Sequence, residues 1–189
     1  MQPDYDDCWL RYEPATEHRE SYRRLCSQAY VSEESRELGA VREELRRGLS
    51  GLIGREPHLW QHPPRTVEGF LAVGTPDDMD VVAQAVDEAV VADLDEDGYL
   101  ITTGEWEGID TLVVTASSDS GLVYGTFDLL RRLSTGEPIE DVHVVEEPAS
   151  PDRLVNHWDN PFRGSVERGY AGQSIFDFET LTDLRERYR

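Results

Sequence analysis

Apolar residues recur at regular spacings through the first 150 residues, and these spacings predict the helices and strands. Between Ser32 and Gly54, they are three or four positions apart, at Leu38, Val41, Leu45, Leu49 and Leu52. That spacing places them on one face of a helix. We expect Ser32 to cap this helix, with Glu33 and Glu34 in the first turn, where the helix dipole favours acids.

The same reasoning predicts further elements on either side of this helix. Helices are expected at Glu17–Leu25, Met79–Ala92 and Gly121–Leu133, and strands at Cys8–Tyr12, Ala29–Val31, Val67–Val73, Gly98–Thr103, Thr111–Ala116 and Val142–Val145. The strand pair around Glu105 should form an antiparallel hairpin with a medium loop. This order predicts an α/β (α+β) fold with a mixed sheet covered by helices.

Two of these helices carry specific expectations about their buried faces. The inward residues of Met79–Ala92 should be Val82, Ala85, Val86, Ala89 and Val90, and those of Gly121–Leu133 should be Leu122, Phe127, Leu130 and Leu133. Gly121 and Gly125 should let the second helix pack closely on the sheet. Ser117 to Ser120 supply its amino-terminal cap.

A linker rich in proline and acid, Glu146–Pro151, predicts a domain boundary near residue 150. Beyond it, Arg153–Trp158 is predicted as a strand and Leu181–Arg189 as the start of an amphipathic helix. Together they form one βα unit, whereas a complete (β/α)₈ barrel needs about 250 residues. We therefore expect an α/β domain at 1–149 and the start of a barrel, incomplete in this chain, at 150–189.

The charged residues are strongly biased toward acids. The chain carries 39 acidic and 18 basic residues and has a net charge of −21. All 18 basic residues are arginine. Adaptation to high salt explains both biases, since screening at 1 M salt extends to only about 3 Å. A GC-rich genome is an alternative for the arginine bias alone. The acidic balance argues against nucleic acid and anionic membranes as partners. The arginines of Arg42–Arg47 alternate with glutamates and predict a solvated helix face.

Several candidate sites have simpler interpretations. His58 and His62 invite a metal hypothesis, but the neighbouring prolines forbid the helix that would bring them together. The acids Asp95–Asp97 lack the full pattern of a calcium loop and predict a solvated turn. Cys8 and Cys26 have no metal or disulfide spacing and are expected in the core.

The amino terminus, MQPDYDDCW, has neither the basic region nor the apolar run of a signal peptide. No run of apolar residues approaches the 18 or so that a membrane-spanning helix needs. The sequence therefore predicts a soluble cytoplasmic protein.

The densest concentration of candidate chemistry lies in Leu154–Phe176. An apolar pair is followed directly by Asn156, His157, Trp158, Asp159 and Asn160, and a Pro/Gly turn leads to Glu167, Arg168, Gly169 and Tyr170. Polar and aromatic groups crowd in this way where a strand ends at a binding site. An ordinary strand end with turn chemistry is the alternative.

These motifs resemble the amino-terminal region of the xylan-acting α-glucuronidases of glycoside hydrolase family 67. The matching segments are WLRY (9–12), REELRRGLSGLIG (42–54), LAVGTP (71–76), DGYLI (97–101), SGLVYGTFDLLR (120–131), NHWDN (156–160) and ERGYAGQSIF (167–176). The resemblance implies an accessory domain similar to that of β-hexosaminidases, followed by a catalytic barrel and a helical domain.

The resemblance also implies the activity. The family removes (4-O-methyl)glucuronic acid from xylo-oligosaccharides with inversion, using no metal or organic cofactor. Its catalytic carboxylates lie on later barrel strands, so the resemblance implies none in this chain and an inactive fragment. The implied partner is a glucuronoxylan-derived oligosaccharide, with a homodimer as one state of the full-length enzyme.

The implied substrate-binding residues are Trp158, Asp159, Asn160, Glu167 and Arg168. Trp158 can stack its indole on a pyranose ring, or instead plug the barrel beneath its rim. Arg168 can hold the glucuronate carboxylate with its bidentate fork, or pair with Glu167 or Asp159. Asn160 either bridges sugar hydroxyls or braces the loop, and His157 is expected to be structural. The alternative for the whole chain is a non-catalytic carbohydrate-binding or structural α/β domain.

Overall fold

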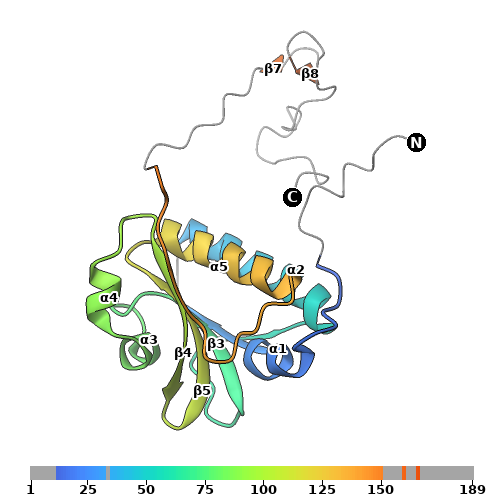
Figure 1. Cartoon of the computed structure of the whole chain (residues 1–189), viewed down its shortest axis with the longest axis vertical. Coiled ribbons are helices and arrows are strands. Elements are labelled where there is room, and N and C mark those ends of the chain that lie inside the picture. The colour runs from blue at the N-terminus through green and yellow to red at the C-terminus, as the bar shows by residue number, and fades with distance from the viewer. Residues whose placement is uncertain (1–11, 33–34, 151–158, 161–164, 167–189) are drawn as a thin grey trace. The chain divides into compact units, whose positions relative to one another are not determined.

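A six-stranded mixed sheet organises the main part of the molecule (Figure 1). The computed structural model describes residues 12–32, 35–150, 159–160 and 165–166. The strands of the sheet are β1 (Gln28–Val31), β2 (His58–Trp60), β3 (Gly69–Val73), β4 (Tyr99–Trp106), β5 (Ile109–Ala116) and β6 (His143–Glu146). Their order is β2-β1-β3-β5-β4-β6. Strands β2, β1, β3 and β5 are parallel to one another, while β4 runs antiparallel to both β5 and β6. The predicted mixed sheet is therefore confirmed.

Helices cover both faces of this sheet. On one face lie α1 (Arg19–Cys26), α2 (Arg36–Ile53) and α5 (Asp119–Ser134); on the other lie α3 (Asp80–Ala85) and α4 (Glu88–Ala92). Figure 1 shows α2 and α5 running side by side, and these two helices pack directly on each other. The chain divides into two units, of which Asp7–Ala149 contains this sheet.

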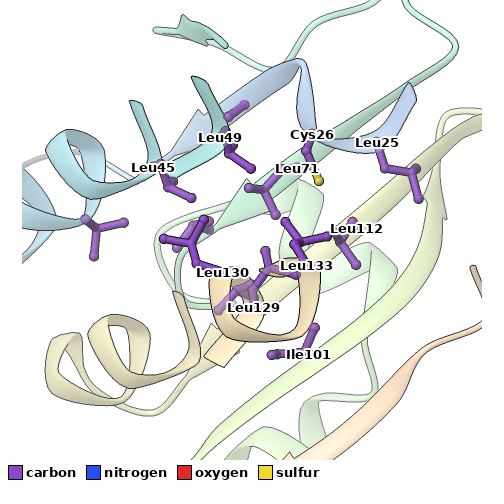
Figure 2. Close-up of a cluster of buried hydrophobic side chains, with 14 of the residues drawn as sticks. Leu25, Cys26, Leu45, Leu49, Leu71, Ile101, Leu112, Leu129, Leu130 and Leu133 are labelled. Carbon is purple, nitrogen blue, oxygen red and sulfur yellow. The ribbon is translucent and has the colours of Figure 1, made fainter. Parts of the chain in front are cut away.

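The larger core lies beneath α1, α2 and α5 and is built mainly from leucine. Figure 2 shows leucines of α2 (Leu45 and Leu49) and of α5 (Leu129, Leu130 and Leu133). They pack against three residues of the sheet: Leu71 of β3, Ile101 of β4 and Leu112 of β5. Burying such side chains is worth about 1.5–3 kcal/mol each relative to leaving them exposed. The smaller core on the opposite face includes Phe70, Met79, Val82, Trp106 and Val113.

Helix α2 has the predicted apolar face, but it begins later than the sequence suggested. All five predicted inward residues are buried. The cap is Ser35, whose hydroxyl accepts from Leu38 N–H at 3.0 Å; the prediction of Ser32 was wrong. Ser32 instead extends strand β1, because its N–H donates to Val73 O at 2.8 Å. The helix ends at Gly54, whose positive φ of 74° favours glycine.

The predicted helix Met79–Ala92 is two short helices. Val86 is extended between them, with φ −125° and ψ 159°, and the Asp87 carboxylate caps α4 by accepting from Ala89 N–H. This break changes which side chains face the sheet. Val81, Val82 and Val91 are buried, whereas Ala89 is exposed, so the predicted inward stripe was partly wrong.

The predicted hairpin is confirmed, but its loop is a tight turn. Strand β4 runs to Trp106 and β5 starts at Ile109, leaving only Glu107 and Gly108 between them. Both have positive φ, 50° and 82°, as a type I′ turn requires. The strands are therefore longer than the polar residues of GEWEGID suggested.

Helix α5 begins at its predicted cap, since Ser118 Oγ accepts from Gly121 N–H at 3.1 Å. The close packing predicted for its glycines is confirmed. A Cβ on Gly121 would lie 2.4 Å from the carbonyl oxygen of Gly98, and one on Gly125 would lie 2.8 Å from Val114. Phe127 was wrongly predicted inward: it is 42% exposed, and Leu129 faces the core instead.

Two other predictions need correction. The proline-rich stretch Arg55–Pro64, for which the sequence predicted no strand, contains the edge strand β2. Arg42 was expected on a solvated face, but its guanidinium donates to the carbonyl oxygens of Val31 (3.0 Å) and Ser32 (2.5 Å), where β1 ends. The predicted short helix before β1 is confirmed as α1, and the last strand as β6.

Three sequence predictions fall on parts of the chain that the structure does not describe. They are the strand Cys8–Tyr12, of which only Tyr12 is described, the strand Arg153–Trp158 and the helix Leu181–Arg189. Cys8 lies in the first of these segments, while Cys26 is buried in the core as expected.

Candidate functional site

The predicted substrate site is described only in part. Asp159 and Asn160 lie in a short strand, whereas Trp158, Glu167 and Arg168 lie outside the described residues, as does His157. Their predicted roles therefore stay predictions.

The described part of this site is a small antiparallel ladder. Strand β7 (Asp159–Asn160) pairs with β8 (Ser165–Val166), with Asp159 opposite Val166 and Asn160 opposite Ser165. Strand β7 is the end of the NHWDN motif, and β8 immediately precedes ERGYAG in the sequence. The ladder thus pairs the end of the first motif with the two residues that precede the second motif in the sequence.

A well-connected charge cluster of the α/β unit lies at the carboxyl end of α5. Asp128 accepts from Arg131 at 2.7 Å and from Arg132 at 2.8 Å, and Glu137 pairs with the same two arginines at 3.3 and 2.7 Å. Burial alone would raise the pKa of Asp128, but the hydrogen bonds from Arg132 and Arg131 outweigh it and the pKa is lowered. Asp128 therefore stays ionised and paired, which suits a structural role and not a general acid.

Tyrosines near this cluster and elsewhere are held protonated. Burial raises the pKa of Tyr22 to about 12, and its hydroxyl donates to the carbonyl oxygen of Glu137 at 2.6 Å. Burial, followed by the charge of Asp128, raises the pKa of Tyr99 well above its usual range. Burial likewise raises the pKa of Tyr12, whose hydroxyl donates to Glu44 at 2.5 Å. None of these phenols is poised to act as a base at neutral pH.

A hollow of about 540 Å³ on the described surface of the α/β unit is lined by both signs of charge, from Arg23, Arg24, Arg55, Glu20, Glu68 and Glu140. Within it Arg24 is already paired with Asp110 and Glu140. Over the described ranges, no three His, Cys, Asp or Glu side chains form a group that could hold a metal ion. Burial raises the pKa of the Cys26 thiol to about 12, so it is a poor nucleophile.

An aromatic surface on strands β1 and β2 is the feature that sequence reasoning missed. Trp60 is 38% exposed, and its indole N–H donates to Gln28 Oε1 at 2.7 Å. The His58 ring lies 4.5 Å from the Trp60 ring, edge to face. The available signal was the alternation His-Leu-Trp, which the surrounding prolines obscured.

In the part of the chain that the structure describes, no helix is both long enough and apolar enough to span a membrane.

Two family models match the chain. The model described as the N-terminus of glycosyl hydrolase family 67 matches residues 8–129, and the model of the middle domain of the same family matches residues 132–189.

Two similar proteins support the same grouping. The chain is 32% identical to alpha-glucuronidase A of Emericella nidulans, over 89% of this chain and 20% of that protein. It is 31% identical to the probable alpha-glucuronidase A of Aspergillus terreus, over 89% of this chain and 19% of the relative. The chain thus spans about a fifth of the length of these relatives.

Among solved structures, a family GH115 4-O-methyl-alpha-glucuronidase with specificity for decorated arabinogalactans matches with a TM-score of 0.41 and 23% identity. The match covers 56% of this chain and 13% of that one.

Proposed function

Because the chain belongs to glycoside hydrolase family 67, we propose that it forms the amino-terminal part of an α-glucuronidase. The enzyme would remove (4-O-methyl)glucuronic acid from xylo-oligosaccharides by inverting hydrolysis. The observation that carries this proposal is the match of both family models, which together span residues 8–129 and 132–189. A purely structural or non-catalytic binding domain is the less favoured alternative.

We propose a division of labour within the chain. Residues 1–149 form an accessory α/β domain similar to that of β-hexosaminidases, and residues 150–189 begin a (β/α)₈ catalytic barrel. The support is the six-stranded sheet with its own cores, followed by the separate β7–β8 ladder. Active sites of such barrels lie at the carboxyl ends of the strands, where the predicted strand 153–158 would deliver NHWDN.

Within the proposed site, Trp158 stacks on a sugar ring, while Asp159 and Asn160 hydrogen-bond its hydroxyls. Arg168, with Glu167 beside it in sequence, meets the glucuronate carboxylate. An inverting hydrolase places an acid and a base about 6.5–9.5 Å apart, with water beside the base. We assign both carboxylates to sequence beyond this chain, so no catalytic residue is proposed here. The chemistry needs only two carboxylates and water, and gives no role to a metal or organic cofactor.

The proposal is tested by sugar binding and by turnover. Aldotetraouronic acid, a xylotriose that carries 4-O-methylglucuronic acid, is titrated into the 189-residue chain in molar salt. We expect binding that Trp158→Ala weakens at least tenfold and that Phe127→Ala, at a surface position of α5, leaves unchanged. The chain should release no glucuronic acid, whereas a longer protein that contains it should.

Absence of glucuronic acid release by the longer protein would overturn the assignment as an α-glucuronidase. Turnover by the 189-residue chain itself would show that our placement of the carboxylates is wrong.

We further propose that the protein is cytoplasmic, adapted to high salt, and a homodimer when full-length. The support for salt adaptation is a net charge of −21 with arginine as the sole basic residue type. The proposed partner is a glucuronoxylan-derived oligosaccharide, not nucleic acid or a membrane.

A further inference from the structure

The aromatic surface on β1 and β2 has a defined architecture. Register pairs Gln28 with His58 and Tyr30 with Trp60, so these four side chains share one face of the sheet. Tyr30 packs on the core beneath α3, whereas its neighbours Ala29 and Val31 belong to the opposite core. Helix α3 covers β3, β4 and β5 of this face, while His58 and Trp60 on β2 stay exposed.

The exposed indole is held in place before any ligand arrives. Its N–H is fixed by Gln28 Oε1 at 2.7 Å, and the His58 ring supports it at 4.5 Å with an interplanar angle of 77°. A rigid aromatic side chain offers a large contact area at little cost in conformational entropy. Gln28 and His58 place amide and imidazole groups beside the ring, where sugar hydroxyls require hydrogen-bonding partners.

The charge of this surface narrows the choice of ligand. Gln28, Tyr30, His58 and Trp60 carry no formal charge at pH 7 with histidine neutral, in a chain whose net charge is −21. These four residues offer no cation to a phosphate or a carboxylate. An indole ring that is held in place and flanked by an amide and an imidazole is complementary to an uncharged pyranose.

We propose that this β1–β2 surface binds the uncharged backbone of a xylan chain, with Trp60 stacked on a xylose ring. The choice of xylan as the ligand rests on the proposed function. The argument that Trp60 can stack on a sugar ring rests only on the contacts of Trp60 with Gln28 and His58. The surface would hold the polymer independently of the uronic acid that the proposed enzyme removes.

The test uses xylohexaose, which has no uronic acid, titrated into the 189-residue chain by isothermal calorimetry in molar salt. We expect the wild type to bind and Trp60→Ala to weaken binding about tenfold. Phe127→Ala is the matched control, because Phe127 is a similarly exposed aromatic (42% against 38%) on α5, which packs on the opposite face of the sheet. Trp60→Phe keeps an aromatic ring and should lose less affinity than Trp60→Ala.

Should Trp60→Ala fail to give a cooperative melt, Gln28→Ala decides the question, because it removes the brace of the indole and leaves the ring. We expect it to weaken binding about threefold. Wild-type affinity in the folded Trp60 or Gln28 variant overturns the proposal. So does equal loss in Phe127→Ala, or no binding of xylohexaose by the wild type.

The two proposals fail separately. In a Trp60→Ala background, Trp158→Ala should weaken binding of aldotetraouronic acid. In the wild-type background, Trp158→Ala should leave xylohexaose binding at Trp60 intact. Absence of glucuronidase activity in the longer protein would overturn the proposed function, but it would not change the interpretation of xylohexaose binding at Trp60.

Discussion

Asp128 is the residue on which the charge network of α5 converges. Its side chain is only 11% exposed, and the side chain of Arg132 is 16% exposed, so water screens this pair less than the outer ones. Most other ion pairs of the described residues join more exposed groups, as in Arg46–Glu56 and Arg65–Glu107. Exposed pairs are typically worth about 0–1 kcal/mol. Among the carboxylates in these ion pairs, Asp128 is therefore the one whose removal should lower the free energy of unfolding most.

We predict that Asp128→Asn lowers the free energy of unfolding at pH 7 by about 1–3 kcal/mol, because Arg131 and Arg132 lose their charged acceptor. The lowered pKa of Asp128 fixes the pH dependence. Its stabilising contribution is complete above the ordinary value of 3.8 and is lost as pH falls through the lower folded value.

Urea denaturation of the wild type and the variant at pH 7 and at about pH 3 measures this difference. The exposed Glu43→Gln removes one negative charge without a buried ion pair and is the control. If the difference in free energy of unfolding between wild type and Asp128→Asn were as large at about pH 3 as at pH 7, the ionised Asp128 carboxylate would not be the source of the lost stability.

At the scale of elements, helix α2 shows how one capping residue sets a boundary. Ser32 and Ser35 both satisfy the sequence rule for a cap. Ser32 is committed to the sheet through its N–H bond to Val73 O, and its carbonyl accepts from Arg42. The backbone is therefore free to turn into the helix only after it, and Ser35 becomes the cap.

We predict that Ser35→Ala lowers the free energy of unfolding by about 1 kcal/mol, since the N–H of Leu38 loses its acceptor. Ser32→Ala is the matched control, because Ser32 acts through its backbone, which alanine preserves. Chemical denaturation of both variants provides the comparison. If Ser35→Ala and Ser32→Ala lost equal free energy of unfolding, the loss could not be attributed to the cap at Ser35.

The two helices α3 and α4 illustrate a different limit on prediction. Valine and alanine spacing in residues 79–92 fits one helix, and no proline or glycine interrupts it. The break at Val86 lets α3 pack on β3, β4 and β5 while Val91 joins Leu94 and Leu100 in a separate small core. The Asp87 cap permits the break, and the packing of α3 and Val91 on different parts of the sheet favours it.

At the scale of the whole molecule, the dominant property is unbalanced charge. With 39 acidic residues against 18 arginines, self-repulsion opposes the compact state at low ionic strength. Salt at 1 M reduces the screening length to about 3 Å and removes most of that repulsion.

We predict that the melting temperature of the chain rises between 0.05 M and 2 M potassium chloride. Differential scanning calorimetry at fixed pH measures it, and an equal osmolality of sucrose provides the uncharged control. A melting temperature that is flat or falls with salt would contradict salt adaptation.

The class of fold, the apolar face of α2, the close approach of Gly121 and Gly125, and the motifs that identify the family could all be predicted from the sequence. The apolar face of α5 could be predicted except at Phe127 and Leu129. These follow from local periodicity, from the absence of a side chain on glycine and from the order of residues along the chain. No contact between distant residues is needed to recognise them.

The folded structure was needed to show which serine caps α2, where the helix after Met79 breaks, and that Phe127 faces outward. It also decided that Trp60 and Gln28, 32 positions apart, meet on one surface. Each of these outcomes depends on strands that pair across long stretches of sequence, and local pattern carries no information about which strands become neighbours. The substrate surface we infer on β1 and β2 exists only because the sheet places those two strands side by side.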